Sequence, residues 1–220
     1  MLTAEGISPR FLSLLESEPL AAMSVLDVAT GQGRLALALA PHCRNVIGID
    51  REPSLIDEAR RRAQAAGLAN IAFTVADADH VDFTEVLSGR PRAHPDMVTA
   101  HLYLSDTLVA KASQALLRGG VLACVGFHAD QWRETGRRSR FAYDEDQMAR
   151  VLDAGDFAVE HLEVERDVRT FASLEAALAA VVALEDRWRA DGRWFRYIAY
   201  LEEGGRQLTR AALIVKARRR

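Results

Sequence analysis

Residues 25–36 read VLDVATGQGRLA, an apolar run with one acid in it, then two glycines one residue apart, then the start of a helical pattern. Glycine adopts backbone conformations with positive φ and lets a backbone come close to a ligand. A strand, a glycine turn and a helix in this order typically begin a nucleotide-binding βαβ unit. The stretch therefore predicts an α/β fold with a ligand at the turn.

Aliphatic runs and helical patterns alternate through the first 130 residues. Residues 53–66 and 106–117 carry apolar side chains at helical spacing, and a glycine follows each pattern closely. The aliphatic runs between the helical patterns cover 24–28, 46–50, 71–75, 97–100 and 121–127. Continuous aliphatic strands separated by helices indicate a parallel sheet covered on both faces.

The pattern changes after residue 128. Residues 128–143 form a polar, arginine-rich loop, and a helix starts at Asp144. Two further strands are expected at 157–168 and 208–217, with a helical segment at 171–203 between them. No Pro/Gly/Ser-rich linker separates these parts. We therefore expect one domain, 1–220, whose 171–203 insertion is either a substrate lid or a dimer element.

Composition excludes several classes of protein. A net charge of −3 on 220 residues gives no broad basic field for nucleic acid. Cys43 and Cys124 show neither metal-ligand nor disulfide spacing, and we expect no metal. The N-terminus lacks a signal-peptide pattern, and the longest apolar stretch, 176–184, is too short to cross a bilayer. These features predict a cytoplasmic protein that does not enter a membrane.

The glycine turn fits more than one ligand. Residues 31–36 satisfy the G-x-G-x-x-A dinucleotide pattern, and Asp50 lies near the position that binds ribose hydroxyls. Asp27 inside the first strand and Asp77 after the third argue against an NAD enzyme, because dinucleotide folds usually keep that first strand apolar. No tyrosine is followed four residues later by lysine, and no lysine follows either glycine as a P-loop requires.

Taken together, the motifs resemble those of class I S-adenosylmethionine-dependent methyltransferases. VLDVATGQG resembles the first motif, with Ala29 where many members have glycine, and IGID and VADADHV resemble the ribose-binding and adenine-binding motifs. PDMVTAHLYL, LLRGGVLACVGFH and LTRAALIVKA resemble the later strands. The resemblance implies a Rossmann-like, doubly wound sheet of seven strands, mostly parallel with an antiparallel last strand, and S-adenosylmethionine as cofactor.

The resemblance also implies the cofactor-binding residues. Asp50 would hold the ribose hydroxyls, Asp77 with the Ala78 amide the adenine edge, and the glycines would leave room for the methionine portion. Leu55 is either core or an apolar surface near the adenine, and the core is favoured. The full expected set is Asp27, Ala29, Thr30, Gly31, Gly33, Asp50, Arg51, Asp77, Ala78 and His101.

The acceptor is less well specified. The fourth-strand motif has neither the Asn-Pro-Pro-Tyr of amine methylation nor a Pro-Cys, and no RNA-binding appendage is visible. These absences favour methyl transfer to a small molecule by in-line displacement. An RNA or protein methyltransferase, or a non-catalytic regulator that binds S-adenosylmethionine, stays open.

Groups expected near the acceptor follow the fourth and fifth strands. His101 and His128 are each either a general base with a pKa near neutral or a hydrogen-bonded structural histidine, His101 can also merely contact the cofactor, and the roles without catalysis are favoured. Aromatic residues of the insertion either cap a substrate, form a homodimer contact or pack on the sheet. The arginines at 133, 137, 138 and 140 either meet an anionic acceptor or are solvated. The expected substrate residues are Tyr103, Trp132, Tyr143 and Trp194.

Overall fold

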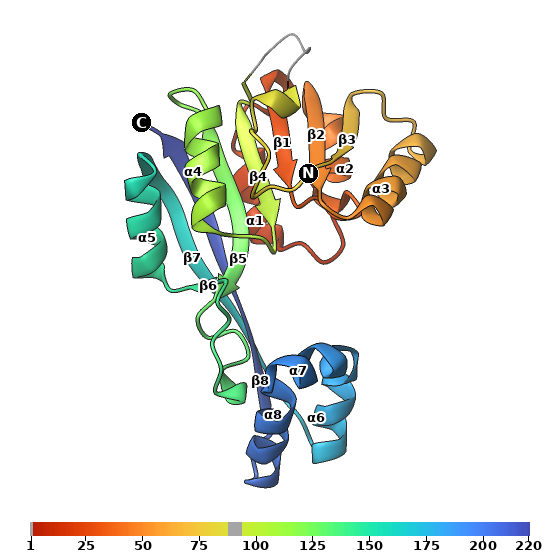
Figure 1. The fold of residues 1–220 in the computed structure, drawn as a ribbon, viewed down its shortest axis with the longest axis vertical. Helices are drawn as coiled ribbons and strands as arrows, with labels where there is room; N and C mark the ends of the chain where they lie inside the picture. Colours follow the sequence, from red (N-terminus) through yellow and green to blue (C-terminus); the bar gives the residue numbers. More distant parts are fainter. Residues whose placement is uncertain (1, 88–93) are drawn as a thin grey trace. The chain divides into compact units, whose positions relative to one another are not determined.

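A computed structural model of the chain describes residues 2–87 and 94–220. Its sheet has the strand order β3-β2-β1-β4-β5-β8-β7, with a short strand β6 paired to β5 (Figure 1). The prediction of a seven-strand, mostly parallel sheet is confirmed, and β6 adds an eighth strand inside the segment predicted as a loop. The bounds are β1 Ser24–Val28, β2 Asn45–Asp50, β3 Ile71–Val75, β4 Met97–His101, β5 Val121–His128, β6 Ala142–Tyr143, β7 Phe157–Thr170 and β8 Gln207–Arg219.

The pairing directions follow from the register. Strands β1 to β5 pair in parallel along the order 3-2-1-4-5. The last strand runs the other way. The Gly119 amide donates to the Arg219 carbonyl at 2.8 Å and the Arg219 amide donates to Gly120 at 2.8 Å, so the start of β5 meets the end of β8. One end of the sheet is therefore antiparallel, as expected.

Eight α-helices are present among the described residues, and α4 lies in front of the sheet while α1 lies behind it (Figure 1). Helix α1 was not predicted. Ser8 caps it, proline follows at its first position, and Phe11, Leu12 and Leu15 bury its inner face. The bounds are α1 Pro9–Glu16, α2 Arg34–Leu39, α3 Pro53–Ala65, α4 Asp106–Ala115, α5 Glu145–Ala154, α6 Leu174–Val181, α7 Glu185–Asp191 and α8 Arg193–Glu202.

The chain divides into two compact units. The first unit contains Met1–Gly126, Glu145–Glu163 and Ile214–Arg220, and the second contains Phe127–Asp144 and Val164–Leu213. The expected insertion, 171–203, is thus part of a larger second unit, because the chain segments at both of its ends and the loop after β5 belong with it.

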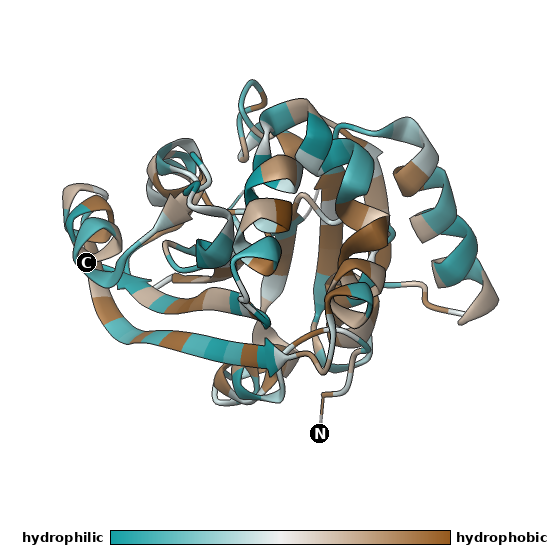
Figure 2. Cartoon of the chain, turned by 90° about the horizontal axis from the view of Figure 1, so that it is seen from below, coloured by the Kyte–Doolittle hydropathy of each residue, from teal (hydrophilic) through white to brown (hydrophobic). Residues whose placement is uncertain are grey.

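Each unit has its own apolar core. In the first unit all five residues of β1 are buried, and the central strands are mostly brown in Figure 2. In the second unit the core is largely aromatic, with Trp188 and Tyr197 fully buried and Trp132 and Trp194 nearly so. Within the part of the chain that the structure describes, no helix is long and apolar enough to cross a membrane.

Candidate functional site

The carboxyl ends of β1 and β4 open on a cavity of about 630 Å³ in the first unit. Ligands of open α/β sheets bind at this edge, and the volume lies within the range of about 300–1,000 Å³ for small-molecule sites. Five of the ten residues expected to bind the cofactor line the cavity together, namely Asp27, Ala29, Thr30, Gly31 and His101.

Asp27 is the buried acid of the first motif. Its side chain is 1% exposed, and its two oxygens accept hydrogen bonds from Thr30 Oγ1 at 2.6 Å and Thr99 Oγ1 at 2.8 Å. Burial raises the pKa of Asp27 to about 6, although both hydroxyls oppose this effect. The donors that a buried carboxylate needs are therefore supplied by the glycine turn and by β4.

The two glycines of the turn have different surroundings. Gly31 has φ 56°, and a Cβ added to it would meet no atom within 4 Å, so the backbone faces open space at the cavity. Gly33 has φ 79°, but a Cβ there would lie 2.8 Å from Phe73 Cζ and 3.2 Å from Ala59 Cβ. Gly33 does not line the cavity. It allows α2 to begin against β3 and α3.

Ala29 departs from the glycine common at this motif position. Its φ is 53°, in the left-handed region that favours glycine. The backbone at this position therefore keeps a glycine-like conformation although the residue carries a methyl group.

Asp50 ends β2 beside the glycine turn. Its Oδ2 accepts the Gly31 amide at 2.8 Å, and its Oδ1 accepts the Glu52 amide at 3.0 Å. A carboxylate has about four acceptor positions. Each oxygen of Asp50 therefore has one acceptor position left, which suits the two neighbouring hydroxyls of a ribose. The chain's residues fit S-adenosylmethionine on this ground and on the open space at Gly31.

The expected adenine-binding residues lie at the end of β3. Asp77 Oδ1 accepts the Asp79 amide at 2.9 Å, and this bond, together with His80, lowers the pKa of Asp77. Asp77, Ala78 and Arg51 do not line the cavity, and Asp50 meets it only through its bond to Gly31. The register brings Asp77 to the same edge as Asp50, because β3 pairs with β2 in parallel and Asp50 lies opposite Val75.

His101 lines the cavity at the end of β4. Burial, with a contribution from the Arg34 guanidinium, lowers the pKa of His101 to about 4. This differs from the near-neutral pKa that we expected for a general base. The imidazole is consequently uncharged over the physiological range, and it is a weak proton acceptor.

Sequence reasoning missed one wall of the cavity. Glu5, Gly6 and Ile7 line it from before α1, and Arg34 lines it from the start of α2. Arg34 Nη1 donates to the Glu5 carbonyl at 3.4 Å, so the arginine links the two segments. Arg34 follows the second glycine directly, and that position was the available signal. Leu55, for which we favoured a core position, also lines the cavity.

The residues expected to contact the acceptor are divided between the units. Tyr103 in the first unit donates its hydroxyl to Asp79 at 3.1 Å. His128 and Tyr143 are opposite each other on β5 and β6 in the second unit, where His128 is buried and its Nδ1 accepts the Asp130 amide at 3.1 Å. Trp132 and Trp194 belong to the aromatic core.

No group of three or more histidine, cysteine or acidic side chains in the described segments is arranged to hold a metal ion.

The whole constellation matches a known family. A family model described as a methyltransferase domain matches residues 20–197, which contain every predicted site residue. The chain belongs to this family. The class I S-adenosylmethionine-dependent methyltransferase predicted from the motifs is thus confirmed, and with it S-adenosylmethionine as the cofactor of the family.

Individual relatives resemble different parts of the chain. Aklanonic acid methyltransferase DauC of Streptomyces sp. (strain C5) is 39% identical over 131 residues, 56% of either protein. The structure of YcgJ from Bacillus subtilis matches 97% of this chain and 99% of its own at 17% identity, with a TM-score of 0.70. The magnesium protoporphyrin IX methyltransferase ChlM of Synechocystis, with bound SAH, matches 96% of this chain and 80% of its own at 14% identity and a TM-score of 0.62.

The matches to curated sequences are mostly short. The chain covers 13%, 24% and 29% of the length of the first three curated relatives, among them an RNA methyltransferase and a protein-L-isoaspartate O-methyltransferase. The likeness to solved structures at these identities supports the fold.

Proposed function

We propose that this protein transfers the methyl group of S-adenosylmethionine to a small-molecule acceptor. The observation that carries the proposal is the hydrogen bond between Asp50 and Gly31, the glycine of the turn that lines the cavity. The Gly31 amide orients the Asp50 carboxylate at 2.8 Å, while the Cα of Gly31 leaves the space beside it open. One side chain can therefore bind a ribose while the adjoining backbone makes room for an amino-acid tail.

Each residue has a distinct task in this reaction. S-adenosylmethionine, when bound, supplies an electrophilic methyl group that an acceptor attacks in line. Asp50 holds the ribose hydroxyls, and Asp27 fixes the turn through Thr30 and β4 through Thr99. Alignment of donor and acceptor supplies much of the rate enhancement in such displacements. The contribution of the chain is thus mainly positional.

The histidine at the cavity supports the same view. With a pKa of about 4, His101 stays neutral and accepts a hydrogen bond without removing a proton efficiently. We propose that His101 orients the cofactor or the acceptor as a neutral hydrogen-bonding group. An acceptor that is already deprotonated or has a free lone pair needs no general base.

A small acceptor is favoured by charge and by the relatives. The net charge of −3 does not provide the basic surface on which nucleic-acid enzymes depend. By their names, DauC acts on aklanonic acid and ChlM on magnesium protoporphyrin IX, both small molecules. A small-molecule acceptor is therefore part of the proposal.

The insertion and the cysteines bear on assembly and location. Of the aromatic residues in 171–203, Phe195 is 60% exposed, and it is the side chain that a homodimer contact would use. Burial raises the pKa of the Cys43 thiol to about 11 and that of the Cys124 thiol to about 12, so both free thiols are unreactive and suit a reducing compartment. We propose that the protein works in the cytoplasm.

Calorimetric titration tests the cofactor directly. We expect S-adenosylmethionine and S-adenosylhomocysteine to bind and NAD to produce no heat. Asp50→Ala should lose at least about tenfold in affinity, because charge-assisted hydrogen bonds are removed. Asp57→Ala is the matched control, since Asp57 is an exposed acid of α3 that pairs with Arg60 rather than with the glycine turn. Binding of NAD alone, or equal affinity in both variants, would refute the proposal.

A second titration tests the class of acceptor. If a small molecule is the acceptor, tRNA should show no salt-dependent binding and no methyl incorporation. A steep fall of tRNA affinity with salt would instead identify a nucleic-acid substrate.

A further inference from the structure

Two arginines line the cavity of the first unit, and their side chains differ in what they already bind. Arg62 Nε donates to Glu58 Oε1 at 2.7 Å, and Arg62 Nη2 donates to Gln32 Oε1 at 2.8 Å. Arg34, the first residue of α2, makes one side-chain hydrogen bond within the described residues, from Nη1 to the Glu5 carbonyl at 3.4 Å. A guanidinium has five N–H donors, so most of those of Arg34 are left for a ligand.

The guanidinium of Arg34 lies among the residues that form the cavity. A Cβ on Gly6 would lie 2.7 Å from Arg34 Nη1, which places the guanidinium against the N-terminal wall. The charge of Arg34 also contributes to the lowered pKa of His101, which lines the cavity from the end of β4. The arginine therefore acts on the cavity between that wall and β4, and the neighbouring imidazole adds no second positive charge.

The charges of the lining match those of the amino-acid end of the cofactor. S-adenosylmethionine carries a positive sulfonium, a positive ammonium and one negative carboxylate. The lining contains two acids, Glu5 and Asp27, which attract the two positive groups. Arg34 is the lining cation with donors to spare, and a guanidinium can bind a carboxylate through two parallel hydrogen bonds. The open space beside Gly31 leaves room for the chain that carries the carboxylate.

We propose that Arg34 binds the carboxylate of S-adenosylmethionine and thereby fixes the amino-acid end of the cofactor in the cavity. The inference rests on the proposed function, because it assigns a residue to one end of the cofactor of that reaction. The sulfur atom carries the ribose on one side and the amino-acid chain on the other. Asp50 on the ribose and Arg34 on the carboxylate together orient the third substituent, the methyl group, for in-line attack.

A pair of ligands that differ in one group tests the assignment. The whole protein is titrated calorimetrically with S-adenosylmethionine and with its decarboxylated analogue, which keeps the adenine, the ribose, the sulfonium and the ammonium. We expect the wild-type protein to bind S-adenosylmethionine at least about tenfold more tightly, the difference that a charge-assisted hydrogen bond provides. Equal affinities for the two ligands would overturn the proposal.

Three substitutions test the residue. Arg34→Gln should weaken S-adenosylmethionine binding about tenfold and change the affinity for the decarboxylated analogue by less than about twofold. Arg34→Lys keeps the charge but not the paired donors, so it should retain part of the preference. Arg118→Gln is the matched control, because Arg118 is an exposed arginine of the same unit just before β5, at the opposite edge of the sheet. The control should keep the full preference.

Two results with Arg34→Gln would refute the assignment. An unchanged preference would mean that the carboxylate is bound by other groups. An equal loss of affinity for both ligands would mean that Arg34 only maintains the shape of the cavity.

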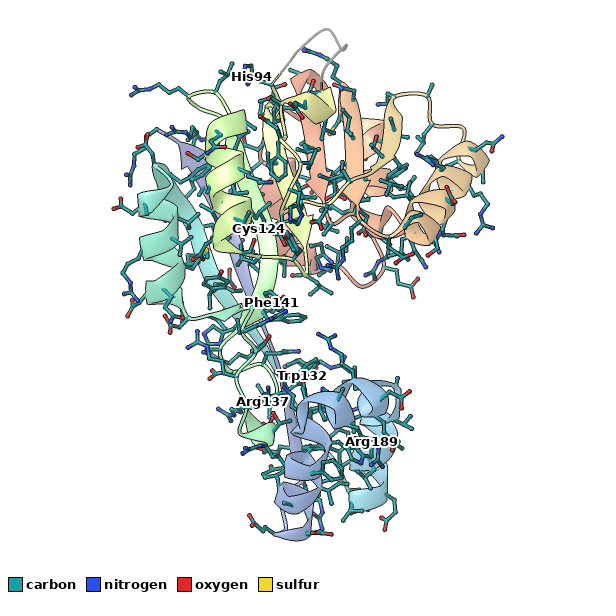
Figure 3. The ribbon with its side chains drawn as sticks, viewed as in Figure 1. His94, Cys124, Trp132, Arg137, Phe141 and Arg189 are labelled. Carbon is teal, nitrogen blue, oxygen red and sulfur yellow. The ribbon has the colours of Figure 1, made fainter. Side chains whose placement is uncertain are left out.

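The fold of each variant is checked by thermal unfolding followed by circular dichroism. Tryptophan emission cannot replace this measurement, because Trp132, Trp188 and Trp194 all belong to the second unit, where Figure 3 labels Trp132. Arg34 is exposed and glutamine forms helices well, so we expect Arg34→Gln to unfold within about 2 °C of wild type.

The wild-type titrations also separate the two proposals. Binding of S-adenosylmethionine without a preference over the decarboxylated analogue would overturn the role of Arg34 alone. Absence of S-adenosylmethionine binding by the wild-type protein would overturn the proposed function itself.

Discussion

Ala29→Gly is expected to stabilise the protein, which is unusual for a change at a ligand cavity. Ala29 has φ 53°. The left-handed conformation costs an alanine about 1–2 kcal/mol, because its Cβ approaches the following carbonyl oxygen. Glycine has no such cost, but its greater conformational entropy stabilises the unfolded chain by about 0.4–1 kcal/mol. The difference predicts a net stabilisation of about 0.5–1 kcal/mol.

The assay is thermal unfolding with a matched control. In a chain of this size 1 kcal/mol shifts Tm by about 2–4 °C, so Ala29→Gly should raise Tm by about 1–4 °C. Ala110→Gly makes the same chemical change at an exposed site inside α4, where the backbone is helical. That variant should lose about 1 kcal/mol in free energy of unfolding and about 2–4 °C in Tm.

The two variants should shift Tm in opposite directions, and this contrast tests whether the backbone of Ala29 is strained. If Ala29→Gly lowers Tm as far as Ala110→Gly does, the positive φ of Ala29 carries no strain, and the explanation of this departure from the family motif fails. Titration of both variants with S-adenosylmethionine is the accompanying control, and we expect nearly unchanged affinities.

Three further predictions concern the glycine turn, Asp27 and His101. Gly33→Ala should lower Tm by several degrees, because the new Cβ would lie 2.8 Å from Phe73, with little change in cofactor affinity per folded molecule. Gly31→Val should instead lower cofactor affinity severely. Asp27 has a folded pKa of about 6 against 3.8 unfolded, so its ionisation reduces stability above pH 6 and this loss disappears as the pH falls toward 4. The free energy of unfolding of Asp27→Asn minus that of wild type, measured by chemical denaturation, should fall by about 1 kcal/mol from pH 7 to pH 5, and a constant difference would contradict the raised pKa. Because the pKa of His101 is about 4, His101 should not titrate between pH 5.5 and 8. The pH–rate profiles of wild type and His101→Gln should therefore have the same shape over that range.

The central strands were predictable because they are continuous aliphatic runs, as burial on both faces requires. Predicted and observed strands agree within two residues at each end. The two-residue β6 has no such pattern, and it forms because Phe127 and His128 present an open edge to Ala142 and Tyr143. Pairing of this kind depends on chain geometry rather than on local composition.

The two glycines show where motif reading ends. Both have positive φ, and the sequence assigned both to the ligand. The structure separates them through a contact with Phe73, which is 40 residues further along the chain. What a glycine makes room for depends on the neighbour that tertiary packing provides. Only Gly31 has open space beside it.

The wall made by the N-terminal segment was invisible for a related reason. Gly6 and Glu5 belong to no motif, and they reach the cavity because α1 packs its apolar face and Arg34 spans to the Glu5 carbonyl. Gly6 has φ 72°, which favours glycine, and a Cβ there would lie 2.7 Å from Arg34 Nη1, so a larger residue would displace the guanidinium. The sequence contains both partners of this contact but not their proximity.

Asp27 combines what sequence can and cannot provide. An acid inside an apolar strand predicts that donors must be present, and this inference needs no coordinates. The identity of the donors does need coordinates, because Thr99 lies 72 residues away on β4 while Thr30 is local. The two hydroxyls tie the turn and β4 to the same carboxylate. Any movement of the glycine turn therefore breaks a buried hydrogen bond, and that cost keeps the cavity wall in place before a ligand arrives.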